Sequence, residues 1–478
     1  MSMNIYKSTY TGAQLDAAIQ KCDLLAGDVR AAIARKGGRI DGQTPVSQFA
    51  AAVESIGEYQ PRPEWGDLAA LCPTYGFVAV VTDEPPVDSE GIVFCFNSFF
   101  AGTVDWGDGT VETEWKFCHD HVYTPGTGQV DSQGNEFWIV KVSCTERTDN
   151  MNFVNGPDSE RVGGVVSSLK YICFGGETVT GTITFGCESS MGHLLSYPHL
   201  EAIRMVGEHY HVPVLKMNQT VKHLIVDEDA VCTKLPNDAL DNSIARMNRP
   251  LVVAAESDIY TDSVFYRNYD NEMSLDFSEV DSSARSVYRG FAYSRIRRVI
   301  FPSDGTEMLT ANYSFQGNTQ VEEIVFPDTM PDCASIKYML SGTSRLKRLV
   351  LPADLGENVA KVDGTQAFSG CGYRGVIALP NTKFSVLHAN GASHELCRIK
   401  GLSFSPQSPF DGAAPQLDIS YSDIDGDGIR AILALLPDVS SAADGITRTV
   451  SIVGATGASD IGEETLASVA TKGWTVTR

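Results

Sequence analysis

The chain has 478 residues, a length that the usual domain size divides into roughly three domains. An apolar share of 43% and a charged share of 20% are those of globular proteins, which excludes wholesale disorder and a collagen-like chain. The formal net charge is -23, and because nucleic acids and anionic membranes attract basic side chains, neither partner suits the chain as a whole.

The chain carries no evident targeting segment. Residues 1–7 lack a basic region followed by an apolar core, so we expect no secretory signal. The apolar run 76–81 is far shorter than the roughly 20 residues of a membrane span. The 11 cysteines are scattered and are expected to be buried small hydrophobes in a protein that folds in a reducing cytosol. A bridge between Cys95 and Cys144 is the one disulfide that we consider.

Residues 1–60 are predicted to form a module of short helices. A break is expected at Gly27-Asp28, and a further helix covers residues 46–56. An apolar stripe on so short a segment needs a partner to bury it. The inward positions that we single out are Leu15, Ile19, Ile33, Phe49 and Val53.

The run Tyr-Thr-Gly-Ala-Gln-Leu-Asp-Ala-Ala-Ile at residues 10–19 resembles the opening of many bacteriophage tail and fibre proteins. Residues 31–37 and 49–56 resemble them as well. In that family the N-terminal module attaches to the virion. The resemblance therefore implies that the five apolar positions named above serve virion attachment.

Residues 74–148 are predicted to be all β, after a stiff proline-containing linker. Asp108-Gly109 between alternating runs is a strong hairpin signal. The order Trp106-Gly-Asp-Gly-Thr110, His121-Val-Tyr123 and a late strand at 137–142 resembles the PKD-like, immunoglobulin-type domain. That resemblance implies a β-sandwich that acts as a spacer or an adhesive module.

Residues 165–410 repeat the pattern apolar-x-x-apolar-x-apolar, usually closed by proline, as in Ile296-x-x-Val299-x-Phe301-Pro302. A period near 25 residues lies in the leucine-rich-repeat range, and stacking buries the inward face that one repeat cannot bury alone. The copies at 251 and 275 are the weakest. The central positions are 172, 203, 224, 251, 275, 299, 324, 349, 377 and 402.

A small motif precedes several of these strands: Phe315-Gln-Gly-Asn318, Leu340-Ser-Gly-Thr343 and Phe368-Ser-Gly-Cys371. It resembles the bacterial surface-antigen (BspA-like) leucine-rich repeat, in which an aromatic residue or leucine followed by Ser-Gly-Cys packs the opposite wall. Repeats of that family serve in adhesion and also occur in phage proteins. The resemblance therefore implies a binding solenoid.

Residues 411–478 are predicted to form an α/β cap on the open end of the solenoid. Strands are expected at 417–420, 448–453 and 474–476, with one helix from Asp425 through Leu436. A second helix is expected to be capped by Asp460, with Glu463 at the third position. The whole chain is thus predicted to be multidomain and mainly β.

Three patterns have the spacing of metal ligands, and each has a simpler interpretation. Asp423-x-Asp425-x-Asp427 matches the first half of an EF-hand loop, but Ala434 stands where the bidentate glutamate belongs, and a helix N-cap explains the same residues. His119-x-His121 and His209-x-His211 each place two imidazoles on one strand face without an evident third ligand. We therefore expect no metal site and no cofactor.

No catalytic residue can be assigned. The Gly-x-Ser-x-Gly, Walker and His-Glu-x-x-His motifs are absent from the sequence. Carboxylates are abundant, but no local motif selects the pair that glycoside cleavage requires, and Glu322-Glu323 is typical of a solvated strand face. We therefore do not expect an enzyme.

An aromatic segment at 258–269 is the main candidate for a binding surface. Aromatic rings and arginine are favoured at binding hot spots, and rigid rings stack on sugars or proteins at low entropic cost. The alternative is that Phe265 and one tyrosine fill the core. The candidate residues are Tyr260, Phe265, Tyr266, Arg267 and Tyr269.

These observations together predict a phage virion protein, a tail fibre, baseplate or head appendage made in the bacterial cytoplasm. Its helices would contact other virion proteins, and its repeats would bind a host glycan or protein, or another virion protein, by avidity. The net negative charge of the chain would make neighbouring copies repel one another. A homotrimer is the expected oligomer. The alternatives are a structural decoration or connector, a tail-associated polysaccharide depolymerase, and a bacterial surface adhesin, against which the missing signal argues.

Overall fold

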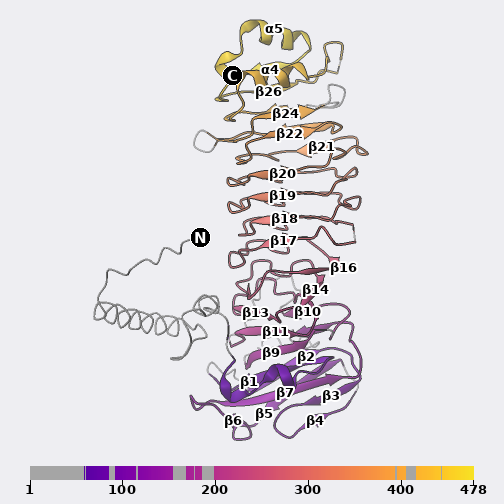
Figure 1. Ribbon diagram of the computed structural model, residues 1–478, viewed down its shortest axis with the longest axis vertical. Coiled ribbons are helices and arrows are strands. Elements are labelled where there is room, and N and C mark those ends of the chain that lie inside the picture. The colour runs from indigo at the N-terminus through magenta and orange to yellow at the C-terminus, as the bar shows by residue number, and fades with distance from the viewer. Residues whose placement is uncertain are drawn as a thin grey trace, which may run out of the picture. The chain divides into compact units, whose positions relative to one another are not determined.

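A computed structural model describes the chain from residue 61 onward, together with Tyr59. The described ranges are 61–84, 92–114, 117–153, 168–176, 178–185, 199–281, 283–392, 396–404, 416–442 and 444–478. The predicted N-terminal helices lie outside them, and so do Leu15, Ile19, Ile33, Phe49 and Val53. Residues Pro63–Arg478 form one compact unit, which is mainly β (Figure 1). Within the described ranges, no helix has the length and apolarity needed to cross a membrane.

The first part of this unit consists of two sheets packed face to face, here called the paired sheets. One contains β1, β3, β4, β6 and β7, and the other contains β2, β5 and β8. Phe77 of β1 contacts Phe94 and Phe96 of β2 across the interface, with ring centroids 6.2 and 5.0 Å apart. The short helices η2 (Pro63–Trp65) and α3 (Leu68–Leu71) precede β1. The strands are β1 (Gly76–Thr82), β2 (Ile92–Asn97), β3 (Gly102–Asp105), β4 (Val111–Glu112), β5 (Cys118–Tyr123), β6 (Gln129–Val130), β7 (Glu136–Cys144) and β8 (Met151–Phe153).

Both paired sheets continue without a break into the repeats. β1 pairs on one side with β7 and on the other with β9 (Leu169–Gly175), antiparallel in both cases. β9 then begins a parallel series through β11 (Ala202–Val206), β13 (His223–Val226) and β15 (Arg246–Met247). On the other sheet, β10 (Ile183–Phe185) pairs with β8. The hydrogen bonds of the paired sheets therefore hold the first repeat in place.

The repeats form a stack of parallel strands, here called the strand wall. Leu275, Val299, Ile324 and Leu349 are directly aligned on neighbouring strands, and Ile377 is aligned with Leu402. These six are predicted central positions, so the period found in the sequence is the spacing of the strands. The strands are β17 (Ser274–Asp276), β18 (Arg298–Ile300), β19 (Glu323–Val325), β20 (Arg348–Val350), β22 (Val376–Leu379) and β24 (Gly401–Phe404).

The predicted copy centred on Leu251 is wrong. Met247 of β15, not Leu251, is aligned with Leu224. The chain then passes to β16 (Val253–Ile259), which pairs with β14 (Val231–Leu235) in a separate sheet that also contains β12 (His209–His211). Pro250 has no amide hydrogen to donate to the series, which favours the end of the strand before it.

Opposite the strand wall, tight turns stack on one another and form what we call the turn wall. The turns comprise residues 238–242, 263–267, 289–293, 313–317, 338–342 and 366–370, and the first and last residue of each has a positive φ. Backbone amides donate to the carbonyls of the next turn, for example Phe315 to Met339 at 2.9 Å and Gly317 to Ser341 at 2.7 Å. Phe315, Leu340 and Phe368 of the small motif are buried behind this wall, as predicted.

The last part combines strands with two short helices. Asp425 caps α4, because its side chain accepts a hydrogen bond from the Gly428 amide at 2.8 Å. A helix N-cap was the simpler of the two interpretations of the aspartate run, the other being half of an EF-hand loop. The predicted cap of the second helix is wrong, since Asp460 belongs to η3 and Gly462 caps α5. α4 also ends before Leu436, because Pro437 disfavours helix in the residue that precedes it. The elements are β21 (Val362–Gly364), β23 (Phe384–His388), β25 (Gln416–Asp418), α4 (Gly426–Ala434), β26 (Thr449–Ser451), η3 (Ala458–Asp460), α5 (Glu463–Thr471) and β27 (Thr475–Thr477).

The disulfide considered between Cys95 and Cys144 is wrong, because Cys144 is a free thiol. Phe94 and Phe96 of β2 are fully buried in the core between the sheets. Since side chains alternate along a strand, Cys95 between them points away from that core. Burial raises the pKa of the Cys144 thiol to about 12.

Candidate functional site

The structure separates the five predicted binding residues. Phe265 is 0% exposed and its ring stacks on Phe291, so its assignment to the surface is wrong and the core interpretation is correct. Tyr260 lies under the guanidinium of Arg285, 4.5 Å from its ring centroid. Tyr266 and Arg267 lie together, with the guanidinium 5.1 Å from the ring centroid.

Tyr269 is 56% exposed and lines a different feature, a hollow of about 320 Å³. This hollow occurs between β15, which ends the first series of parallel strands, and β17, which begins the strand wall. Arg246, Arg249 and Arg295 also line it. The side-chain amide of Asn271 bridges the two strands by accepting from the Met247 amide and donating to the Ala245 carbonyl, both at 2.8 Å.

Tyr266 and Arg267 belong to a larger cluster on the turn wall, here called the tyrosine–arginine strip. Arg289 lies at its centre, with its guanidinium carbon 5.5, 4.9 and 5.6 Å from the ring centroids of Tyr266, Tyr288 and Tyr313. The rings of Tyr313 and Tyr338 stack at 5.1 Å with an interplanar angle of 9°. The strip consists of Tyr266, Arg267, Tyr288, Arg289, Tyr313 and Tyr338.

Backbone hydrogen bonds between turns fix the strip. Arg289, Tyr313 and Tyr338 occupy the same position in successive turns, and their amides donate to the carbonyls of Asn312, Lys337 and Thr365 at 3.1, 2.7 and 2.9 Å. All three have a left-handed backbone, with φ of 56°, 59° and 53°. That conformation costs a residue other than glycine about 1–2 kcal/mol. The same conformation recurs at the first and last residue of every turn of the turn wall, so it belongs to the repeat itself.

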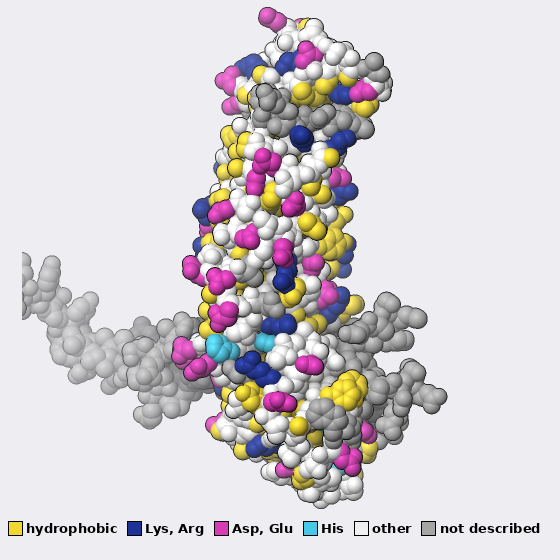
Figure 2. Space-filling view, turned by 90° about the vertical axis from the view of Figure 1, so that its right-hand side faces the viewer, with side chains coloured by type: hydrophobic (Ala, Val, Ile, Leu, Met, Phe, Trp, Pro, Cys, Tyr) yellow, Lys and Arg dark blue, Asp and Glu magenta, His cyan; other side chains and the backbone are white. Residues whose placement is uncertain are grey.

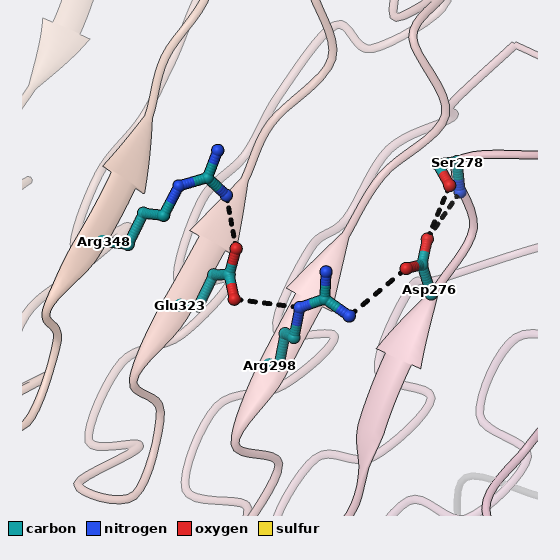
Figure 3. Close-up of polar contacts among 5 residues, drawn as sticks. All are labelled: Asp276, Ser278, Arg298, Glu323 and Arg348. Carbon is teal, nitrogen blue, oxygen red and sulfur yellow. Dashed lines mark hydrogen bonds and ion pairs between the residues drawn. The ribbon is translucent and has the colours of Figure 1, made fainter.

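The arginines of the strip differ in their partners from those of the strand wall. On β17 to β20, Asp276, Arg298, Glu323 and Arg348 form a continuous ladder of ion pairs (Figure 3), with contacts of 3.3 Å from Arg298 to Asp276 and 2.9 Å from Arg298 to Glu323. This ladder agrees with the prediction that Glu323 lies on the solvated face of its strand. Arg267 and Arg289, in contrast, contact no carboxylate among the residues that the structure describes.

The strand wall therefore neutralises its own charges, whereas the described partners of Arg267 and Arg289 in the strip are tyrosine rings and not carboxylates in direct contact. Glu322 likewise contacts Lys347 at 2.7 Å. The face drawn in Figure 2 shows acidic and basic side chains interspersed with apolar ones. Half-buried tyrosines, and guanidiniums without a carboxylate partner among the described residues, equip the strip for non-covalent recognition.

Beneath the strip lies a buried carboxyl group, Asp241, which is 8% exposed. Burial and the neighbouring Asp238 raise its pKa to about 6, against the opposing charges of Lys216, Arg267 and Arg289. Because the folded-state pKa lies above the unfolded value of 3.8, ionisation of Asp241 opposes folding. This destabilisation is absent at low pH and develops as the pH rises from about 4 to about 6.

Replacing Asp241 with asparagine is therefore expected to raise the free energy of unfolding at pH 7 and to leave it nearly unchanged at pH 4. The difference between variant and wild type should grow through the interval between these values. Urea unfolding at pH 4, 5, 6 and 7, followed by circular dichroism, measures it. An equal effect at pH 4 and pH 7 would show that Asp241 does not titrate in this range.

The histidine pair on β5 has structural partners. His119 Nδ1 lies 2.6 Å from a Glu112 carboxylate oxygen, and His121 Nε2 lies 2.8 Å from Asp108 of the Trp-Gly-Asp-Gly-Thr motif. The ring of His121 also stacks on Trp106 at 5.0 Å. In the described part of the chain, no three histidine, cysteine, aspartate or glutamate side chains are arranged to hold a metal ion.

The sequence prediction missed Tyr288, Arg289, Tyr313 and Tyr338. One signal was present, since Tyr313 and Tyr338 are separated by one full repeat and stand two residues before Phe315 and Leu340 of the small motif. Arg289 follows the same rule relative to Phe291. The chain matches no family model, no curated protein and no solved structure.

Proposed function

We propose that this chain is a bacteriophage virion protein, a tail fibre, baseplate or head appendage, that recognises another surface through its repeats. The observation that carries the proposal is the tyrosine–arginine strip, in which six side chains suited to recognition are held by a rigid ladder of turns. Ordering such side chains before binding reduces the entropy that association would otherwise cost. The resemblance of residues 10–56 to phage proteins supplies the virion part of the proposal.

The same proposal assigns finer folds to the two main parts. We propose that the paired sheets are a PKD-like, immunoglobulin-like sandwich, which the contact of His121 with Asp108 supports, since both residues belong to the motif of that family. We propose that the repeats are a leucine-rich-repeat solenoid of the BspA-like type. In-register strands about 25 residues apart and the buried positions of Phe315, Leu340 and Phe368 support it.

Recognition through the strip would gain strength from several copies on one particle. If each copy binds weakly, copies that engage one surface together bind far more tightly than one. A homotrimer would present three strips, and the strong net negative charge would keep neighbouring copies apart.

Alanine substitution of both Tyr313 and Tyr338 is expected to weaken binding to host cells at least about tenfold, because truncating a central aromatic commonly costs more than 1 kcal/mol. The matched control replaces two exposed apolar residues elsewhere, Leu309 and Val376, which are 61% and 56% exposed. Labelled full-length protein is titrated onto intact cells, and circular dichroism verifies that each variant is folded. Equal binding by both double variants would exclude the strip as the recognition surface.

The virion part is tested separately by quantitative mass spectrometry of density-purified particles. We expect the chain to co-purify at a fixed ratio to the major capsid protein, and the double tyrosine variant to be incorporated at the same ratio. Recovery of the chain with the cell envelope would favour an adhesin instead. Incorporation into particles without any cell binding would favour a decoration or connector, and release of reducing ends from host polysaccharide would favour a depolymerase.

A further inference from the structure

We propose that the tyrosine–arginine strip binds a carboxylated polysaccharide. This inference rests on the proposed function, since it names the ligand class of the surface assigned there. It starts from two unpaired cations on a chain whose net charge is -23. Arg267 and Arg289 contact no carboxylate among the described residues, although the arginines of the strand wall are paired.

Of the acids near these arginines, two are held by other groups and the third is buried. Asp238 accepts from the Lys216 ammonium at 2.9 Å, and Asp262 accepts from the Tyr288 backbone amide at 2.8 Å. Asp241 is buried beneath the strip, 4.0 Å from Lys216, and its charge also interacts with those of Arg267 and Arg289. At physiological ionic strength, charges of the strand wall and the chain ends are screened over about 8 Å. An approaching anion therefore meets the guanidiniums as the nearest charges of the strip.

Guanidinium geometry points to a carboxylate. The group is planar, and two of its parallel N–H bonds match the two oxygens of a carboxylate. Tyr266, Tyr288 and Tyr313 surround the Arg289 guanidinium, within 5.6 Å of its carbon. Because rings attract a cation through their faces, they orient the guanidinium and leave N–H edges to donate to a ligand.

A sugar polymer fits the strip better than an extended peptide. Peptides that add to a protein edge need free backbone amides and carbonyls. The turn-to-turn ladder already uses the amides of Arg289, Tyr313 and Tyr338, and bonds within each turn use their carbonyls. What remains available is a row of rings, hydroxyls and guanidiniums. These three residues stand at the same position of successive turns, so a ligand with a regular repeat meets one side chain of the strip per turn.

The experiment measures binding of the full chain to three carboxylated polymers, polygalacturonate, hyaluronate and polysialic acid, by titration calorimetry. Dextran is the neutral control, and the matched ligand control is each bound polymer after reduction of its carboxyl groups to alcohols. We expect at least one carboxylated polymer to bind and its reduced form to bind at least about tenfold more weakly. The variant Arg267→Gln/Arg289→Gln should lose a similar factor.

The protein control is Arg298→Gln/Arg348→Gln on the strand wall, which should bind the polymer as the wild type does. The inference is overturned if none of the three polymers binds, if reduced polymer binds equally well, or if the two double variants behave alike. If cells are still bound through Tyr313 and Tyr338 while the polymers are not, the proposed function stands and an acidic protein becomes the expected ligand. If neither cells nor polymers are bound, both proposals fail.

Discussion

Alanine in place of Gly317 is expected to destabilise the turn wall by about 3 kcal/mol, from a backbone cost and a steric cost. Gly317 has a φ of +65°, which a residue with a Cβ adopts at a cost of about 1–2 kcal/mol. An added Cβ would also lie 2.4 Å from Cε1 of Tyr293, whose ring covers the glycine. Tyr293 can relieve this overlap only by leaving its place beside Tyr266, 6.2 Å away between ring centroids.

Gly342 provides the matched control, because it occupies the same position in the next turn. Its φ of +75° carries the same backbone cost, but the nearest atom to an added Cβ is 3.5 Å away. Gly342→Ala should therefore cost about 1–2 kcal/mol, distinctly less than Gly317→Ala. Urea unfolding followed by far-ultraviolet circular dichroism compares the two, and equal losses would mean that the Tyr293 ring does not restrict position 317.

The strand wall could be predicted because each of its strands carries a local pattern. Val299, Ile324 and Leu349 stand at the centre of the same apolar motif, and the structure aligns them on neighbouring strands. The pattern failed at Leu251, which has the right spacing but follows Pro250. There a side chain distant in sequence, Asn271, supplies the hydrogen bonds that a strand would have made.

The pairing of β1 with β9 could not be predicted from local sequence patterns. Both strands are buried along their whole length, and a uniformly apolar run does not indicate which partner lies on either side. The face of Cys95 was, in contrast, available from the alternation of β2. The inward direction of Phe94 and Phe96 fixes the outward direction of the residue between them.

The strip could be predicted only in part. Tyr266 and Arg267 were found because they are adjacent in the sequence. The other four residues join them only through the stacking of turns, namely Tyr288, Arg289, Tyr313 and Tyr338. The left-handed backbone of Arg289, Tyr313 and Tyr338 also has no signal in the residue types, because that conformation favours glycine and asparagine over arginine and tyrosine. The hydrogen-bond ladder between turns imposes it.

Truncation of Phe315 to alanine should have the largest effect of any single substitution proposed here, about 3–5 kcal/mol. The side chain is 0% exposed and links both walls of the stack. Its ring lies 5.1 Å from Phe291 of the turn wall, and 6.1 Å from Phe326, which follows a strand of the strand wall. Phe301, which follows β18, lies 6.4 Å from the same ring. One cavity therefore removes contacts from two consecutive turns and from the ends of two strands.

Because each repeat contacts only its neighbours, the damage from Phe315→Ala should be local before it is global. Hydrogen exchange is expected to accelerate most for amides 311–318 and those of β18 and β19, and least for β1 and β7, which belong to a different sheet. Calorimetric unfolding gives the total loss, with Tyr269→Ala, at an exposed site, expected to change stability by less than about 0.5 kcal/mol. Equal acceleration of exchange in β1 and β18 would contradict this expectation, because it would show that the paired sheets and the repeats unfold as one cooperative unit. The pairing of β1 with β9 joins the paired sheets to the first repeat, and it is the structural reason to test for that outcome.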